Sequence, residues 1–298
     1  MHIHSLYIYP IKSLPGIPLD SSHLTPHGLL HDRIFLLERT DTTPPRVIMI
    51  GKEPKMATFT TAFSDPTNLL VTHTPSSSSI TIPLCPPADT LRPAAVTLHQ
   101  SPATGASELT SPVISTFFST HLTYPTRLLY LGHGSRPILG SVVPAASDAS
   151  KTIGFSDCAP LMIAPLPSLR AIPCEDADMQ RFRPNIVLDG TIDAWEEDFW
   201  RVLQIEGVGE VELTANCVRC RSLDVDFKGG WETGEGGRLK RLMKERRVDK
   251  GAKWKPVFGR YGGVRGEGGV VKVGGAVEVK EKGEERCVLK WPGISTGE

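Results

Sequence analysis

Two cysteines separated by two residues are the groups in this chain best suited to chemistry. Cys217 and Cys220 have the spacing of a zinc half-site or of a redox motif. A structural zinc would need a second such pair, but the other four cysteines stand alone and all nine histidines precede Gly134. Arg219 lies between the two thiols, where a guanidinium favours a thiolate and attracts anions. The pattern therefore leaves one thiolate available for a soft metal that other groups also hold.

Three further clusters carry side chains that bind anions or form hydrogen bonds. They are Lys12 with Ser13 in a loop bounded by proline and glycine, Asp32 with Arg33 at a strand start, and Arg181, Arg183 and Asn185 before a strand. A lysine and a hydroxyl in a loop can bind a phosphate together with free backbone N–H groups. Each cluster alone is also typical of a surface ion pair or a loop cap, so both interpretations stay open.

Short apolar and β-branched stretches predict a chain built mainly of strands. The predicted strands cover residues 3–11, 33–37, 47–50, 161–164 and 185–190. Alternating residues on both sides of Gly274 and Gly275 predict a hairpin over residues 270–279. A strand and a turn are expected after Cys220, where a redox motif would open a helix. Residues 60–112 are rich in Ser, Thr and Pro, which predicts short strands with long, partly disordered surface loops.

Helices are expected in only two places. Residues 112–122 have apolar side chains at helical spacing, and Ser111 precedes them as a cap. Residues 238–248 predict a short basic helix, and residues 132–152 predict a linker between two halves of the chain. The predicted fold class is therefore mostly β (α+β) with few helices, which favours barrel-like folding over a doubly wound sheet.

Length and charge exclude several classes of protein. The 298 residues suffice for one large domain or two ordinary ones, and 33 basic residues balance 33 acidic ones. Residues 228–298 carry 17 basic against 10 acidic side chains, but no zinc finger or RNA-binding motif accompanies them, so no nucleic-acid partner is expected. No apolar run approaches the ~18 residues of a membrane span, and the first residues lack a signal-peptide pattern. We expect a soluble, intracellular protein.

Six short motifs occur in the order and spacing of a known family. They are Tyr9-Pro-Ile-Lys-Ser-Leu-Pro-Gly, Asp32-Arg33, Phe155-Ser-Asp-Cys-Ala-Pro, Phe182-Arg-Pro-Asn-Ile-Val, Asn216-Cys-Val-Arg-Cys and Val257-Phe-Gly-Arg-Tyr. With these motifs the chain resembles proteins in which a MOSC N-terminal β-barrel domain precedes a MOSC (molybdenum cofactor sulfurase C-terminal) domain. The resemblance is closest to the mitochondrial amidoxime reducing components and their bacterial relatives, and it spans nearly the whole chain. It implies two packed β-barrel-like domains, over residues 1–130 and 131–298.

The resemblance also implies a molybdenum cofactor, a pterin that holds the metal together with one cysteine thiolate. Cys220 matches the metal ligand, and Asp157 matches a catalytic position beside the metal, where it would orient a metal ligand or relay protons. The other implied cofactor-binding residues are Lys12, Ser13, Arg33, Ser156, Arg183, Asn185 and Arg219. The chain departs from the family pattern at Cys158 and Val218, which would tune access to the metal, and at Gly275 in a turn.

The activity that the resemblance implies is the reduction of N-hydroxylated compounds such as amidoximes and hydroxylamines. Its electrons would come from an NADH-dependent flavin reductase through a haem electron-carrier protein. The sequence has no counterpart of the membrane anchor or ferredoxin domain of some relatives, so we expect a cytoplasmic or mitochondria-associated protein without its own anchor. Pyridoxal phosphate is associated with the family only through the desulfurase domain of full sulfurases, which also has no counterpart here.

Two other functions stay open at the level of sequence, because one fold serves several functions. In the first, the chain carries the molybdenum cofactor or transfers sulfur that Cys220 holds as a persulfide. In the second, it is a β-rich interaction protein without a cofactor. The presence of Cys220, Arg183 and Asn185 argues against the second.

Overall fold

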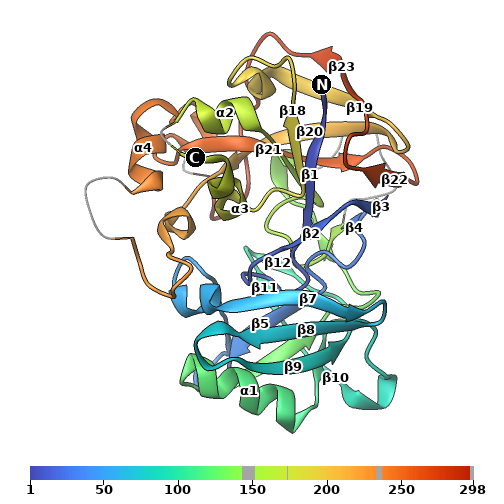
Figure 1. Cartoon of the computed structure of the whole chain (residues 1–298), viewed down its shortest axis with the longest axis vertical. Helices are drawn as coiled ribbons and strands as arrows, with labels where there is room; N and C mark the ends of the chain where they lie inside the picture. The colour runs from blue at the N-terminus through green and yellow to red at the C-terminus, as the bar shows by residue number, and fades with distance from the viewer. Residues whose placement is uncertain (143–151, 173, 233–236, 296–298) are drawn as a thin grey trace.

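The computed structural model describes residues 1–142, 152–172, 174–232 and 237–295. Its largest element is an eight-stranded sheet in the upper part of Figure 1. The strands, in order across the sheet, are β2 (Ile17–Leu19), β1 (His2–Ile8), β18 (Ile186–Asp189), β17 (Leu161–Pro165), β21 (Val257–Val264), β20 (Gly209–Val218), β19 (Trp200–Ile205) and β23 (Val277–Lys282). Only β17 and β18 run parallel. The strands turn from vertical at β1 to horizontal at β21 in Figure 1, so the sheet curls into a half-barrel.

Two further sheets and the longest described helix form the lower part of Figure 1. The first sheet has the order β10 (Leu91–Pro93), β13 (Ser107–Leu109), β14 (Thr126–Tyr130), β5 (Phe35–Arg39) and β6 (Arg46–Val47). The second has the order β7 (Phe59–Asp65), β8 (Asn68–His73) and β9 (Ser78–Pro83). The structure thus contains regular strands where the Ser/Thr/Pro-rich composition predicts short ones, and the predicted mostly β architecture is confirmed.

Helix α1 (Pro112–Leu122) confirms the predicted helix and its cap. The Ser111 hydroxyl accepts a hydrogen bond from the Ile114 N–H, which is otherwise unpaired at a helix start. Ile114, Phe118 and Leu122 recur every four residues and are all buried, so one face of the helix packs on the core.

The remaining elements are short. The small sheets are β22 (Gly269–Lys272), β3 (Ser21–Thr25) and β4 (Gly28–Leu29); β11 (Thr97–Leu98) and β12 (Ser101–Pro102); and β15 (Arg136–Pro137) and β16 (Thr152–Ile153). The other α-helices are α2 (Leu166–Arg170), α3 (Met179–Phe182) and α4 (Arg238–Glu245). Helix α4 corresponds to the predicted basic helix but ends three residues earlier. None of the helices in the described ranges combines the length and apolarity that crossing a bilayer requires.

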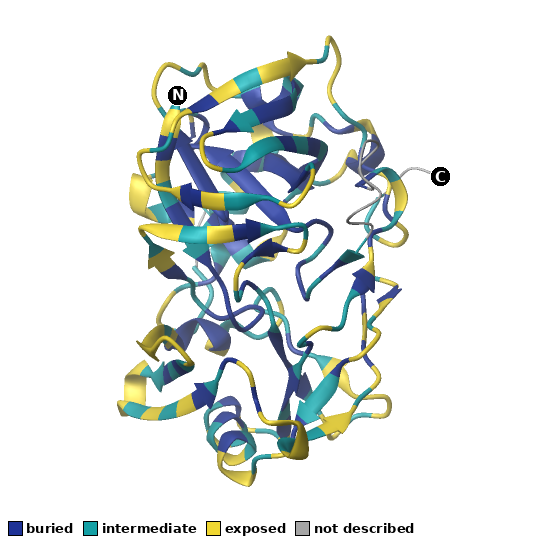
Figure 2. Ribbon diagram, turned by 90° about the vertical axis from the view of Figure 1, so that its right-hand side faces the viewer, coloured by how far each residue is buried: buried dark blue, intermediate teal, exposed yellow. Residues whose placement is uncertain are grey.

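The start of the chain is built into the sheet of the second half. Strand β1 lies between β2 and β18, and its residues Ile3, Leu6 and Ile8 are buried. The largest buried apolar cluster contains residues from Ile3 to Val277 and draws on both halves of the sequence. Figure 2 shows buried stretches in the upper and in the lower part of the molecule. The division into residues 1–130 and 131–298 stays a prediction, and most of the predicted linker, residues 143–151, lies outside the described residues.

The hairpin predicted over residues 270–279 is wrong. Strand β22 pairs with β3, whereas β23 pairs with β19 in the large sheet. The Gly274 N–H donates to the Ile3 carbonyl, and the Ile3 N–H donates to the Gly275 carbonyl. The turn is therefore bound to β1, and its two flanking strands belong to different sheets.

Two other predicted strands are also replaced by turns. Only β6 (Arg46–Val47) forms within residues 47–50, because the Met49 carbonyl accepts the N–H groups of Lys52 and Glu53 and closes a turn. After Cys220 the chain forms a 3-10 helix over Arg221–Asp224. Both turns border the cavity described next.

Candidate functional site

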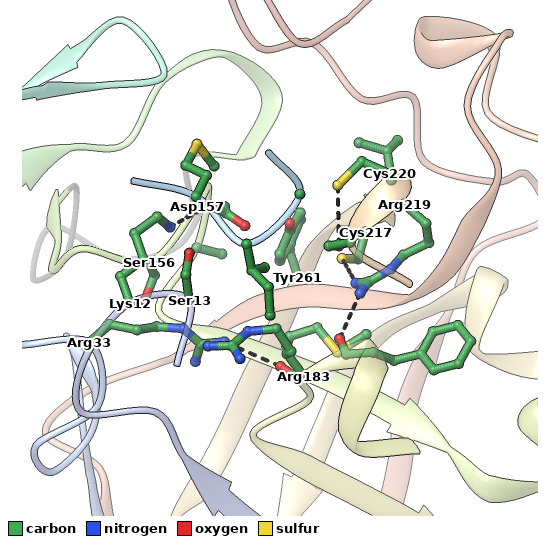
Figure 3. A pocket seen from close by; sticks show the side chains of 18 of the residues that line it. Lys12, Ser13, Arg33, Ser156, Asp157, Arg183, Cys217, Arg219, Cys220 and Tyr261 are labelled. Atoms are coloured by element: carbon green, nitrogen blue, oxygen red, sulfur yellow. Dashed lines mark hydrogen bonds and ion pairs between the residues drawn. The ribbon is translucent and has the colours of Figure 1, made fainter. Parts of the chain in front are cut away.

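A cavity of about 270 Å³ lies where segments from both halves of the sequence meet (Figure 3). This volume is near the lower end of the range for small-molecule sites. Six basic side chains and one acidic side chain line it, so its electrostatics favour an anionic ligand. All nine predicted site residues line this cavity: Lys12, Ser13, Arg33, Ser156, Asp157, Arg183, Asn185, Arg219 and Cys220.

Two partly buried arginines and a buried tyrosine form a cationic cluster on one side of the cavity. The guanidinium groups of Arg33 and Arg183 lie 4.5 and 4.2 Å from the centre of the Tyr9 ring, within the range of cation–π contacts. Arg33 donates to Asp32 at 2.6 Å and to the Arg183 carbonyl at 3.2 Å. These contacts fix both arginine forks before any ligand binds.

Arg183 carries a partly buried charge without a carboxylate to balance it in the described ranges. Its guanidinium donates to the Leu14 carbonyl at 2.6 Å, and no carboxylate in the described ranges forms an ion pair with it. Burial, followed by the positive charge of Arg33, lowers the pKa of Arg183 to about 10. A buried cation is costly without a counter-charge. A phosphate dianion in the cavity would supply that charge and match the geometry of the arginine fork.

Backbone strain accumulates at the same place. Ser13, Arg33 and Arg183 have φ values of 74°, 51° and 56°, in the left-handed region that non-glycine residues seldom adopt. Such strain costs about 1–3 kcal/mol per residue and is common at functional sites. With this backbone conformation Ser13, Arg33 and Arg183 line the cavity from the loop after β1, the segment before β5 and the end of α3.

Asn185 acts mainly as a support for this cluster. Its side-chain carbonyl accepts hydrogen bonds from Arg33 at 3.2 Å and from the Met162 N–H at 3.1 Å. Its amide donates to the Tyr7 carbonyl at 3.2 Å. With these partners Asn185 ties β1, β17 and Arg33 together and positions the guanidinium.

Asp157 lies beside the cluster and has two basic partners. Its carboxylate accepts from Lys12 at 2.5 Å and from His99 at 3.1 Å. Burial alone would raise the pKa of Asp157, but Lys12 and His99 hold it well below its usual value. Burial lowers the pKa of Lys12, although Asp157 opposes this effect. Lys12 and His99 therefore keep the Asp157 carboxylate ionised. The side chain is 47% exposed and remains accessible from the cavity.

The segment that carries Ser156 and Asp157 is held by Arg136, a residue that the sequence analysis does not identify. Arg136 is fully buried and donates to the carbonyls of Leu98, Gly154 and Ser156. Burial lowers its pKa to about 10. Ser156 itself is buried at the cavity wall, so Arg136 fixes the backbone on which both site residues depend.

Cys217 and Cys220 differ in surroundings. Cys217 is buried, and its sulfur accepts from the Arg219 guanidinium at 2.8 Å. Cys220 is exposed, and its sulfur lies 3.2 Å from the Ser222 hydroxyl. Figure 3 shows Cys220 and Arg219 across the cavity from Lys12 and Asp157. Cys220 is therefore the thiol that a ligand in the cavity can reach.

Arg219 has an unused hydrogen-bond donor at the cavity. Its guanidinium also donates to the Phe182 carbonyl at 2.8 Å, but its Nε is buried without a partner in the described part of the chain. A buried unpaired donor costs about 1–3 kcal/mol. An acceptor group of a bound ligand would satisfy it.

Sequence reasoning missed three features of the site. His99 occupies a two-residue turn between β11 and β12, and Arg136 lies on β15. The turn after β6, with Met49, Ile50, Gly51 and Lys52, forms part of the cavity wall. The expected influence of Cys158 on access lacks support because this residue is buried and does not line the cavity, whereas Val218 does. In the sequence His99 is an isolated histidine and the turn after β6 is an ordinary loop, so neither stands out as part of a site.

Comparison with protein families identifies the class of protein. Residues 1–125 match the MOSC N-terminal beta barrel domain, and residues 150–278 match the MOSC domain. The chain belongs to the family of proteins that combine these two domains, as the six sequence motifs predict.

Several relatives of known name are similar to most of the chain. It is 28% identical over 242 residues to mitochondrial amidoxime reducing component 2 of Macaca fascicularis, in an alignment that covers 75% of this chain and 66% of the relative. It is 28% identical over 302 residues to mitochondrial amidoxime-reducing component 1 of Homo sapiens, covering 92% and 82%. The molybdenum cofactor sulfurase of Danio rerio is 25% identical over 260 residues, which cover 78% of this chain and 29% of that protein.

The residues at the cavity fit a molybdenum cofactor. Molybdenum is a soft metal that accepts thiolate ligands, and the Cys220 thiol faces the cavity. Arg33 and Arg183 offer paired guanidinium donors to a phosphate. The unpaired Nε of Arg219 offers one more donor to a pterin or phosphate oxygen. In the described ranges no group of three or more His, Cys, Asp and Glu side chains is arranged to hold a metal ion.

Proposed function

We propose that this protein binds the molybdenum cofactor, with Cys220 as the thiolate ligand of the metal, and reduces N-hydroxylated compounds. The observation that carries the proposal is one cavity with an accessible thiol on one side and a partly buried cationic cluster on the other, in which Arg183 has no carboxylate partner in the described ranges. The relatives named amidoxime reducing component support amidoximes as substrates, and we include hydroxylamines as compounds with the same N–O bond.

The cofactor would supply two-electron redox chemistry at the metal. Arg33 and Arg183 would bind its phosphate, and Asn185 would hold Arg33 in place. Lys12 and Ser13 would contact the cofactor from the loop that lines the phosphate end of the cavity. Arg219 would contact the pterin through its free Nε. In this arrangement the protein positions the metal next to Cys220 and leaves the exposed side of the cavity for the substrate.

The reaction would break the N–O bond of the substrate and consume two electrons and two protons. An amidoxime would yield an amidine and water. Asp157, ionised and open to the cavity, would orient a water molecule or receive a proton that enters from solvent, and Lys12 and His99 hold its carboxylate in place. The electrons would come from an NADH-dependent flavin reductase through a haem electron-carrier protein.

An assay with a chemical electron donor tests this proposal without the partner proteins. Protein from a host that makes the cofactor is supplied with reduced methyl viologen and an aryl amidoxime, and the amidine is quantified. We expect turnover by the wild type and a loss of about 100-fold or more in Cys220→Ala, because the metal loses its protein ligand. Cys85→Ser, which alters another exposed cysteine outside the cavity, should match the wild type. Equal turnover in Cys220→Ala would contradict the assignment.

The exposure of Cys220 also favours a second candidate, a sulfur or cofactor carrier. A persulfide on Cys220 would receive its sulfur from a desulfurase, and the similarity to a molybdenum cofactor sulfurase supports this alternative. The two candidates differ in one result. Sulfane sulfur on Cys220 without any amidoxime turnover would favour the carrier, and turnover without sulfane sulfur would favour the reductase.

A further inference from the structure

The cavity wall next to the Cys220 thiol is formed by the first half of the sequence, and at Gly51 no side chain fills the space beside it. Gly51 lies in the turn after β6 and lines the cavity together with Cys220 and Ser222. A methyl group added at Gly51 would lie 3.7 Å from the Cys220 sulfur and 3.6 Å from the Ser222 nitrogen. The missing side chain therefore leaves space directly beside the thiol.

The backbone does not require a glycine at this position. The φ angle of Gly51 lies outside the left-handed region, and the distances from an added methyl to its neighbours are those of ordinary van der Waals contacts. An alanine would therefore fit without backbone strain, whereas a β-branched side chain would extend toward the sulfur. The fold would therefore accept a small side chain at position 51, so the space beside the thiol is not a consequence of backbone constraints.

Gly51 is on the side of the cavity that solvent reaches. Cys220 is exposed, and so are Lys52 and Arg221, which also line the cavity. At the other end of the cavity Lys12, Ser13 and Asn185 are buried, and Arg33 and Arg183, which would bind the cofactor phosphate, are only partly exposed. A molecule that enters from solvent therefore meets the space between Gly51 and Cys220 before it reaches the cationic cluster.

We infer that Gly51 is a specificity-determining residue that admits substrates with a bulky group, such as an aryl ring, on the carbon that bears the N-hydroxylated nitrogen. This inference rests on the proposed reductase function. A small side chain at this position would narrow the entrance beside the thiol and discriminate by substrate size. In hydrophobic pockets one methyl group changes kcat/KM ratios by roughly 10–200-fold.

The first test measures access to the thiol and needs no cofactor. In cofactor-free wild type, Gly51→Ala and Gly51→Val, the rate of Cys220 alkylation is measured by peptide mass spectrometry with iodoacetamide and with N-phenylmaleimide. We expect Gly51→Val to slow the bulky reagent by about 10-fold more than the small one, and Gly51→Ala to have an intermediate effect. Gly230→Val, where an added Cβ has no neighbour within 4 Å, should match the wild type. Equal rates in all variants would overturn the inference.

The second test uses the same variants with the cofactor bound. We expect wild-type molybdenum content and a ratio of kcat/KM for an aryl over a methyl amidoxime that falls about 10-fold in Gly51→Val. Loss of molybdenum in Gly51→Ala would overturn the inference, because Gly51 would then border the metal rather than the substrate. If the wild type reduces no N-hydroxylated compound while the alkylation rates still depend on size, the proposed function fails and the access role of Gly51 stands.

Discussion

The features of Arg183 that reduce the stability of the protein are those that would favour the binding of an anion. Its backbone is in the left-handed conformation, it lacks a carboxylate partner in the described ranges, and its guanidinium lies near the positive charge of Arg33. This arrangement adds little to folding stability. It does offer a bound anion a positioned guanidinium whose charge no carboxylate balances.

The effect of Arg183→Gln on stability is therefore expected to be small or favourable. We expect the free energy of unfolding of the cofactor-free variant to be within about 1 kcal/mol of the wild type or above it, because the variant removes a partly buried charge that has no ion-pair partner in the described ranges. The pterin content of protein from a cofactor-producing host should fall in the same variant. Chemical denaturation and pterin fluorescence measure the two quantities.

Arg136→Gln is the contrast, because Arg136 is fully buried and donates to three backbone carbonyls, whereas Arg183 is only partly buried and donates to one. Leaving those carbonyls unpaired should destabilise the protein by about 3 kcal/mol or more. If Arg183→Gln destabilised the cofactor-free protein as much as Arg136→Gln does, Arg183 would be a structural residue.

At the scale of single residues, contiguous motifs in the sequence identify residues that line the cavity, while their roles in binding and catalysis stay predictions. Lys12, Arg33, Asp157, Arg183 and Cys220 are all found this way, and all reach the cavity. Prediction fails where a role depends on a rare local conformation.

His99 is such a residue. His99 and Gln100 have φ values of 51° and 63° in a two-residue turn, where Asn-Gly is the usual sequence. Nothing in a His-Gln pair predicts that turn, so the contact between His99 and Asp157 is visible only in the structure.

Glu197 exposes a similar limit at the scale of elements. It lies in the 3-10 helix Glu196–Phe199 before β19 and is fully buried. One carboxyl oxygen accepts from the Ser168 hydroxyl on α2 at 2.8 Å. The other oxygen is buried without a partner in the described part of the chain. A run of three acidic residues in the sequence would instead predict a solvated surface.

Burial raises the pKa of Glu197 from its usual value near 4.5 to about 7. Since the folded-state pKa lies above the unfolded one, the stability that protonated Glu197 contributes is complete below about pH 4.5 and is lost as the pH rises through 7. We expect Glu197→Gln, which stays neutral, to gain up to roughly 3 kcal/mol relative to the wild type between these pH values.

Urea denaturation at a series of pH values measures this difference. Glu278→Gln, an exposed substitution on β23, should keep the wild-type dependence on pH. A constant difference between Glu197→Gln and the wild type would mean that Glu197 is ionised in the folded protein.

Strand pairing is the other feature that local sequence did not predict. The alternating residues around Gly274 and Gly275 favour two strands, and two strands form. Their partners are β3 and β19, because β1 takes the hydrogen bonds of the turn. Local pattern thus predicts that a segment is extended, while its partner strand depends on segments that are distant in the chain.

For the whole molecule, the site depends on the way the two halves of the sequence interlock. Strand β1 inserts beside β18, which brings the Lys12–Ser13 loop against Arg183 and Asn185. The turn after β6 then forms the wall next to Cys220. Neither half contains the complete cavity, so a truncation at residue 130 should remove the site even if a part of the chain folds.

The basic character of the second half is smaller at the surface than its composition suggests. Arg246 forms a buried ion pair with Asp198, and Arg238 pairs with Asp178 and Glu232. These pairs attach α4 and the segment after it to the rest of the molecule. The remaining exposed cations are typical of a solvated helix face.

The content of molybdenum and pterin per chain tests the central claim most directly. Wild type, Cys220→Ala and Cys85→Ser are purified from a host that makes the cofactor, and both components are quantified. We predict near one molybdenum and one pterin per chain in the wild type and in Cys85→Ser, and loss of molybdenum in Cys220→Ala. Wild-type protein with neither molybdenum nor pterin would contradict the account.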